Sequence, residues 1–249
     1  MAQSSTTLTY ADFWRYHGRQ SFWLTRQFSY RIGAALALVA SRVGLSPHAV
    51  TMLSFLTGVG GACAIALSPT MPALTGGILL FIMLHLAYGL DCADGVLARA
   101  TQRTSKAGGL LDKMADLLGA MIIPGLLGVA AFESQAKWTD DIFHPFLVWW
   151  SMMPRLALTT ITWIKEGMTP EIDRKGADDQ RSHTIFWRMK KFAGNLADDV
   201  VYRTGIAVSW AMGCYWDFIF FFQLLCFGML VIYVITSYRD VAASEPPRD

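Results

Sequence analysis

The stretch DCADGVLARATQRTSKAGGLLDKMAD, from Asp91 to Asp116, places four aspartates at or beside the ends of two long apolar segments. A carboxylate at the edge of a hydrocarbon layer costs several kcal/mol unless it is paired or binds a cation, so an ionisable residue there is a candidate functional residue. Four such residues within 26 positions are hard to attribute to chance.

The spacing of the aspartates predicts two helices that each present one acidic face. Asp91 and Asp94 are three residues apart, and Asp112 and Asp116 are four apart, so each pair lies on one side of a helix. If the segment between the pairs turns back on itself, the two helices bring four hard oxygen ligands together. Such ligands suit Mg²⁺ or Mn²⁺ better than a softer metal.

The composition is that of an integral membrane protein. Of 249 residues, 53% are hydrophobic and 16% are charged, and the mean hydropathy is +0.36, which is too apolar for an ordinary soluble domain. The net charge of +2 and the lack of a basic run with interleaved aromatic residues argue against a nucleic-acid partner. The four cysteines stand singly without C-x-x-C spacing and are expected to be small buried residues. Partners are expected in the lipid phase.

The apolar segments predict an all-α fold with six transmembrane helices. The expected crossings lie at about 48–68, 73–98, 108–132, 142–164, 193–213 and 216–237. The fifth has the weakest pattern, because Asp198, Asp199 and Arg203 interrupt its first half.

Two further helices are expected before the first crossing. Residues 9–27 mix aromatic and basic side chains, which predicts a helix lying in the headgroup layer. The apolar stretch 30–43 is too short to cross and predicts a second interfacial or partly buried helix. We therefore expect a single membrane domain. Its parts are interfacial helices in 1–45, a six-helix bundle in 46–237 and a tail in 238–249.

The basic residues predict the orientation. Six crossings put both termini on one side, and 17 of the 21 Lys and Arg residues lie in segments on that side, whereas the outer links hold only Lys137. The positive-inside rule then places both termini in the cytoplasm. We expect a protein of the cell membrane, the inner membrane where there are two, whose aspartates open to the cytoplasm.

The aspartate stretch resembles the signature of the CDP-alcohol phosphotransferases, or CDP-alcohol phosphatidyltransferases, a family of integral membrane enzymes. That signature is D-x2-D-G-x2-A-R-x8-G-x3-D-x3-D, and the chain meets it at every position. The matching residues are Asp91, Asp94, Gly95, Ala98, Arg99, Gly108, Asp112 and Asp116. The segment Ser46 to Thr51 is also similar to a Pro-Asn-x-x-Thr element common in this family, with His48 where Asn is usual.

The resemblance implies a role for each signature residue. Asp91, Asp94 and Asp112 would be ligands of one or two divalent cations that hold a pyrophosphate, and Asp116 would be the general base, able also to join the metal's shell. The remaining signature positions would contact the nucleotide of the donor. These are Gly95, Ala98, Arg99 and Gly108.

The reaction implied is substitution at phosphorus, in which an alcohol hydroxyl attacks a CDP-linked donor and CMP leaves. The expected donor is CDP-diacylglycerol, and the resemblance also implies a homodimer. Arg155 and Arg203 could bind a phosphate on the acceptor, as some family members use glycerol phosphate or inositol phosphate. The alternative for Arg203 is an ion pair with Asp199, four residues before it.

Three other interpretations stay open at this stage. The aspartates could be helix-end charges paired with nearby basic residues, which are Arg99, Arg103, Lys106 and Lys113. An intramembrane prenyltransferase also holds a pyrophosphate with Mg²⁺ and aspartates, but its usual motif spacing differs and its fold needs more crossings. A small cation- or proton-coupled carrier would have acids near mid-membrane and two related halves, and no internal repeat is found.

Overall fold

The structure is a computed structural model that describes residues 8–17, 23–135, 144–168 and 198–244. All the regular elements in these ranges are α-helices, as the apolar pattern predicts. In chain order they are α1 (Tyr10–Arg15), α2 (Trp23–Gln27), α3 (Ser29–Arg42), α4 (Pro47–Ala66), α5 (Ala73–Ala100), α6 (Lys106–Gln135), α7 (His144–Met168), α10 (Asp199–Ala211) and α11 (Tyr215–Ser244).

Among the described residues, four helices are long and apolar enough to cross a membrane, namely α4, α5, α6 and α11. They support an integral membrane protein. The 13 residues of α10 extend about 20 Å at 1.5 Å per residue, which is less than the hydrocarbon thickness of roughly 30 Å. The predicted fifth crossing starts at 193, and residues 193–197 lie outside the described part of the chain. The count of six crossings therefore remains a prediction.

Local sequence signals explain where several helices begin and end. Pro47 occupies the first turn of α4, and the Ser46 hydroxyl accepts a hydrogen bond from the Ala49 amide at 3.2 Å, so a side chain caps the helix. Gly44 and Gly213 follow the ends of α3 and α10 with φ of 75° and 69°. Because glycine adopts this left-handed conformation without steric cost, the chain can leave each helix at once.

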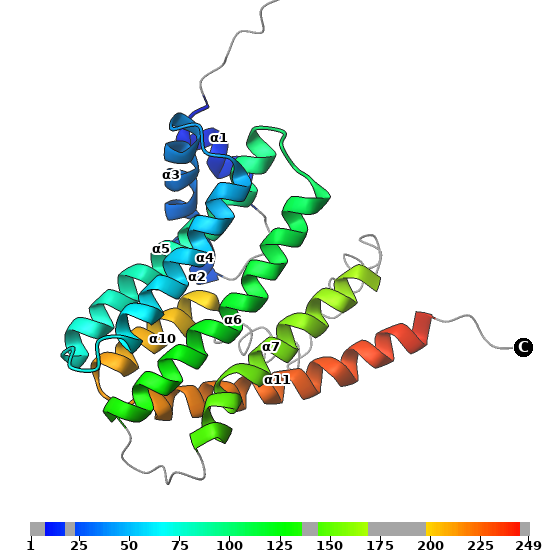
Figure 1. Ribbon diagram of the computed structural model, residues 1–249. Helices are drawn as coiled ribbons and strands as arrows, with labels where there is room; N and C mark the ends of the chain where they lie inside the picture. The colour runs from blue at the N-terminus through cyan, green and yellow to red at the C-terminus, as the bar shows by residue number, and fades with distance from the viewer. Residues whose placement is uncertain (1–7, 18–22, 136–143, 169–197, 245–249) are drawn as a thin grey trace, which may run out of the picture.

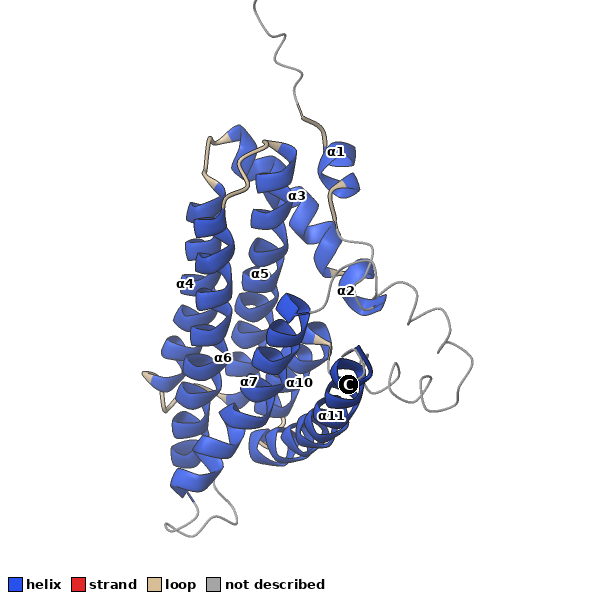
Figure 2. Cartoon of the chain, turned by 90° about the vertical axis from the view of Figure 1, so that its right-hand side faces the viewer, coloured by secondary structure: helices blue, strands red, loops and turns tan. Residues whose placement is uncertain are grey.

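The three N-terminal helices lie along one flank of α5 (Figure 2). The predicted helix over 9–27 contains α1 and α2, with 18–22 outside the described residues, and the predicted helix over 30–43 corresponds to α3. The small residues of α3 face α5, and a Cβ added at Gly33 would lie 2.8 Å from the Cβ of Cys92. Close approach to α5 therefore buries one side of α3.

The remaining helices form the bundle that surrounds the aspartates. α6 runs back in the direction opposite to α5, and α4 packs against both of them (Figure 1). α10 packs tightly on α5, since a Cβ added at Gly77 would lie 2.5 Å from that of Ala211. α7 packs against both α6 and α11, and α11 is inclined to α4, α5 and α6 (Figure 1). This arrangement brings residues of α7 and α10 to the same cavity as the acidic faces of α5 and α6.

Candidate active site

Three of the four signature aspartates come together between α5 and α6. One carboxylate oxygen from each of Asp91, Asp112 and Asp116 lies within 4.8 Å of the others. Asp91 is near the end of α5, whereas Asp112 and Asp116 are on successive turns of α6. The return of the chain between the two helices thus brings together three of the four carboxylates that the spacing predicted as ligands.

Asp94 is close in sequence but has a different environment. Its side chain is 6% exposed, and its Oδ2 accepts a hydrogen bond of 2.5 Å from the Thr51 hydroxyl of α4. This contact ties α5 to α4 and holds the carboxylate in one orientation. Thr51 is the last residue of the segment similar to the Pro-Asn-x-x-Thr element.

Nearby cations do not neutralise this cluster in the part of the chain that the structure describes. There, the ion pairs between side chains both involve Asp199, with Arg155 and with Arg203 as partners. Arg99 instead donates from Nε to the backbone oxygen of Tyr16 at 3.0 Å. The Lys113 ammonium lies 5.4 Å from the centre of a tryptophan ring. The interpretation of the aspartates as paired helix-end charges therefore has no support among the described residues.

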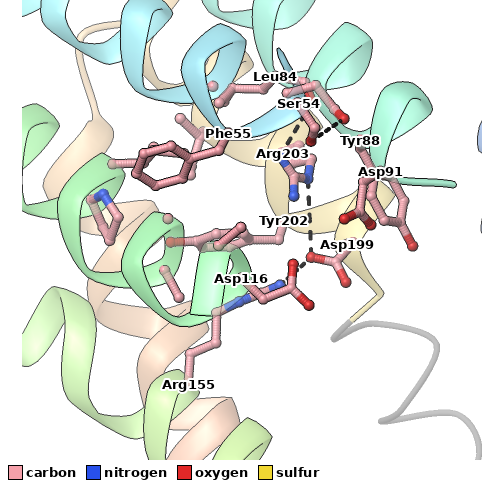
Figure 3. Close-up of a pocket in the computed structure, with 18 of the residues that line it drawn as sticks. Ser54, Phe55, Leu84, Tyr88, Asp91, Asp116, Arg155, Asp199, Tyr202 and Arg203 are labelled. Carbon is pink, nitrogen blue, oxygen red and sulfur yellow. Dashed lines mark hydrogen bonds and ion pairs between the residues drawn. The ribbon is translucent and has the colours of Figure 1, made fainter. Parts of the chain in front are cut away.

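The cluster opens onto a cavity of about 280 Å³ between α4, α5, α6, α7 and α10. Asp91 and Asp116 line this cavity together with Arg155, Asp199 and Arg203 (Figure 3). The lining also includes a group of apolar or small residues from α4, α6 and α10. These are Phe55, Gly58, Gly119, Ile123, Pro124 and Ile206. The cavity therefore offers acidic, basic and apolar surface to one ligand.

Arg155 and Arg203, predicted as a possible phosphate site, do lie together, but Asp199 lies between them. The Arg155 guanidinium donates to Asp199 Oδ1, and Arg203 Nε lies 4.0 Å from the same oxygen. Arg203 also donates to the Leu84 backbone oxygen at 3.2 Å. The Arg155 guanidinium stacks 4.0 Å from the ring centre of Tyr202. Both the predicted proximity and the alternative pairing with Asp199 are thus present in one cluster.

The signature glycines have less free space around them than their lack of a side chain suggests. At the start of α6, a Cβ on Gly108 would lie 2.8 Å from His48 Nε2, and the Gly108 amide donates to Ser105 Oγ at 3.0 Å. A Cβ on Gly95 would lie 3.2 Å from a guanidinium nitrogen of Arg99. A nucleotide that approaches either glycine would therefore contact His48 or Arg99. Ala98 is half-buried on the same part of α5.

Comparison with known proteins places the signature in a family. A sequence model described as CDP-alcohol phosphatidyltransferase matches residues 44–178, which is more than half of the chain. The chain belongs to this family. The match confirms the resemblance seen in the eight signature positions.

A curated relative gives a second comparison. Archaetidylinositol phosphate synthase from Pyrococcus horikoshii is 37% identical over 100 residues, which are 40% of this chain and 46% of the relative. The matched region therefore spans about half the length of that relative.

The signature residues account for only part of the cavity wall. Tyr88, Asp199 and Tyr202 also line the cavity, and sequence reasoning gave none of them a place there. A weak signal existed for Tyr88, which precedes Asp91 by three residues and so shares its helix face. For Asp199 the signal was its position four residues before Arg203.

Proposed function

We propose that this enzyme transfers a phosphatidyl group, or a related phospho-alcohol group, from a CDP-linked donor to an alcohol hydroxyl and releases CMP. The expected donor is CDP-diacylglycerol. The observation that supports this most directly is the cluster of Asp91, Asp112 and Asp116 on a cavity that also contains two arginines. Family membership supports the reaction class.

The donor set of the cluster fits one or two hard divalent cations. All three residues offer carboxylate oxygens, which Mg²⁺ and Mn²⁺ prefer, and the oxygens are near enough to share an ion after small side-chain rotations. Asp94 could add its second oxygen, because Thr51 holds only Oδ2. A bound cation would supply charge neutralisation for the pyrophosphate of the donor.

Asp116 is our candidate for the group that takes the proton of the acceptor. It is the exposed member of the cluster and lines the cavity, so an alcohol can reach it. In the proposed reaction the alcohol oxygen forms a bond to the lipid-side phosphorus, the bond from that phosphorus to CMP breaks, and the alcohol proton passes to the Asp116 carboxylate. Such a transfer depends mainly on positioning and electrostatic stabilisation.

Arg155 and Arg203 are our candidates for binding a phosphate on the acceptor. Their guanidinium groups can each form two parallel hydrogen bonds to phosphate oxygens, and both line the cavity that contains Asp116. The relative is named for archaetidylinositol phosphate, so a phosphate-bearing acceptor is among the candidates. Gly95, Ala98, Arg99 and Gly108 remain the proposed donor-binding positions, together with the His48 side chain beside Gly108.

The orientation and the assembly are also proposals. We infer that the cavity opens to the cytoplasm and that both termini lie there, because 17 of 21 basic residues fall on the predicted inner segments. A reporter fused to the C-terminus should then be cytoplasmic, and one inserted beside Lys137 should be external. An external C-terminus would contradict this orientation. A homodimer, implied by the family, is testable by light scattering in detergent.

The decisive experiment is an assay of CMP release by the detergent-purified protein. CDP-diacylglycerol is supplied with Mg²⁺ and a panel of acceptors that includes serine, glycerol phosphate and inositol phosphate. We expect CMP release that depends on one of these alcohols. Absence of CMP with every acceptor, in protein that remains folded, would contradict the proposed donor. Release of inorganic pyrophosphate from a prenyl pyrophosphate would favour the prenyltransferase instead.

A further inference from the structure

A buried polar contact joins the N-terminal part of the chain to the start of α10. Thr25 of α2 is 3% exposed, and Asp198, the residue that caps α10, is 1% exposed. The Thr25 hydroxyl donates to Asp198 Oδ1 at 2.5 Å, and its amide donates to Oδ2 at 3.2 Å. The Val200 amide also donates to Oδ1 at 3.2 Å. Three donors thus satisfy this buried carboxylate, which would otherwise be costly.

The contact continues to a residue of the cavity wall. The Tyr88 hydroxyl lies 3.2 Å from the Thr25 hydroxyl oxygen. Thr25 has a single hydroxyl hydrogen, and an ionised carboxylate can only accept, so that hydrogen goes to Asp198. Tyr88 must therefore be the donor to Thr25. The chain of hydrogen bonds runs in one direction, from Tyr88 through Thr25 to Asp198.

Both ends of this hydrogen-bond network are next to residues that line the cavity of the proposed acceptor. Asp198 caps the helix whose first turns carry Asp199 and Arg203, and both of these line the cavity. Tyr88 also lines the cavity, and the Arg203 guanidinium lies 4.8 Å from its ring centre. Movement of the α10 start would consequently displace Asp199 and Arg203, whereas the aspartates of α5 and α6 would keep their positions.

We propose that Thr25 and Asp198 are positioning residues, which fix the first turn of α10 so that Arg203 faces the acceptor. This inference rests on the proposed function. The N-terminal segment is then part of the machinery for acceptor binding, although α2 contributes no residue to the cavity lining. A contact that only stabilised the fold would affect donor and acceptor alike, and this difference provides the test.

Two substitutions break the contact with little change of shape. Thr25→Val keeps the side-chain volume but removes the hydroxyl donor. Asp198→Asn keeps a good helix cap but cannot accept from Val200 and from both Thr25 donors at once. Thr25→Ser restores the hydroxyl and is the rescue variant. Thr57→Val is the matched control, because the Thr57 hydroxyl donates only within its own helix, to Leu53, away from the cavity.

Steady-state CMP release is measured for each variant while donor and acceptor are varied separately. We expect Thr25→Val and Asp198→Asn to lower kcat/KM for the acceptor roughly 10-fold and to leave the donor KM unchanged, because misplacement of a binding group affects only the ligand that it contacts. Thr25→Ser and Thr57→Val should behave as the parent. Equal effects on donor and acceptor, or no effect at all, would overturn the proposal.

Hydrogen exchange of the backbone amides of Val200 and Tyr202 gives a readout that needs no activity. Exchange of this first turn should accelerate in Thr25→Val and return to the parent rate in Thr25→Ser, because the cap is less firmly held. Unchanged exchange would overturn the proposal even if kinetics changed. If the parent protein released no CMP with any acceptor, the proposed function would fail, and exchange would still decide whether Thr25 holds α10.

Discussion

The acidic and basic groups on the cavity differ in how the chain builds them. The acidic cluster of Asp91, Asp112 and Asp116 comes from two consecutive helices, and its members have no cationic partner among the described residues. The basic cluster of Arg155, Asp199 and Arg203 comes from α7 and α10, which are distant in sequence, and Asp199 compensates one of its two positive charges.

This difference suggests different roles for the two clusters, metal binding for the acidic one and anion binding for the basic one. Three uncompensated carboxylates repel one another, so the arrangement is stable only with a cation or with protons, and it is poised for metal binding. The basic cluster already has a carboxylate partner in Asp199, and we propose that an anionic ligand can replace it. We therefore expect changes in the acidic cluster to have much larger effects on turnover than changes in the basic cluster.

The largest effect is expected from loss of the metal ligands. Chelation with excess EDTA, or Asp91→Ala, should lower CMP release by about 1,000-fold or more, because charge neutralisation of the pyrophosphate is lost. Mg²⁺ or Mn²⁺ should restore the chelated parent but not the variant. Glu133→Gln is the control, since this exposed carboxylate lies near the other end of α6. Persistent turnover in chelator would contradict the metal assignment.

The next largest effect is expected from Asp116→Asn. This variant distinguishes a role of Asp116 as general base from a role as metal ligand. Asparagine keeps the shape and one acceptor oxygen but cannot take a proton, so turnover should fall about 10²- to 10⁴-fold. Donor affinity, measured by binding of CDP-diacylglycerol, should fall less than it does in Asp91→Ala. Near-normal turnover would show that another group takes the proton. Donor affinity as low as in Asp91→Ala would make Asp116 mainly a metal ligand.

A smaller effect is expected in the basic cluster. Arg203→Gln should raise the acceptor KM about 10-fold for a phosphorylated acceptor and leave the donor KM unchanged, because a charge-assisted hydrogen bond to the acceptor is lost. Arg203→Lys keeps the charge and should lie between this variant and the parent. An equal rise in both KM values would place Arg203 at the donor instead.

The sequence was sufficient for the acidic cluster because its information is local. Helical periodicity puts each pair of aspartates on one face, and a single reversal between α5 and α6 brings Asp91 to Asp112 and Asp116. The same local reasoning located α4, α5, α6 and α11, whose apolar runs are long enough to cross a membrane. It also identified the family, because eight positions at fixed spacing form a specific pattern.

Most contacts in the rest of the site could not be predicted, because they depend on packing between distant helices. Nothing in the sequence pairs Arg155 with Asp199, 44 residues later, or Thr25 with Asp198, 173 residues later. Nor could spacing indicate that Thr51 would hold Asp94 or that His48 would lie beside Gly108. The charges at Asp198, Asp199 and Arg203 weakened the pattern of the fifth crossing because they serve the cavity and its support.

The smallest effect is expected from Asp199→Asn, which tests whether the internal carboxylate limits acceptor binding. The Asp199 side chain is 37% exposed, so the repulsion between it and an acceptor phosphate is screened by solvent. Removing its charge should lower the KM of a phosphorylated acceptor about 2- to 5-fold. A change of this size corresponds to the interaction energy that is typical of partly exposed charge pairs. The KM of an uncharged acceptor should not change. Arg155 should keep its place in the variant because its guanidinium still stacks on Tyr202.

Asp217→Asn provides the control for net charge, since this exposed carboxylate in the first turn of α11 does not line the cavity. A higher acceptor KM in Asp199→Asn would show that the Asp199 carboxylate binds the acceptor directly, for instance by accepting a hydrogen bond from a hydroxyl or an ammonium group of the acceptor. The basic cluster would then bind substrate through its carboxylate as well as through its arginines. In that case carboxylates would bind ligands in both clusters.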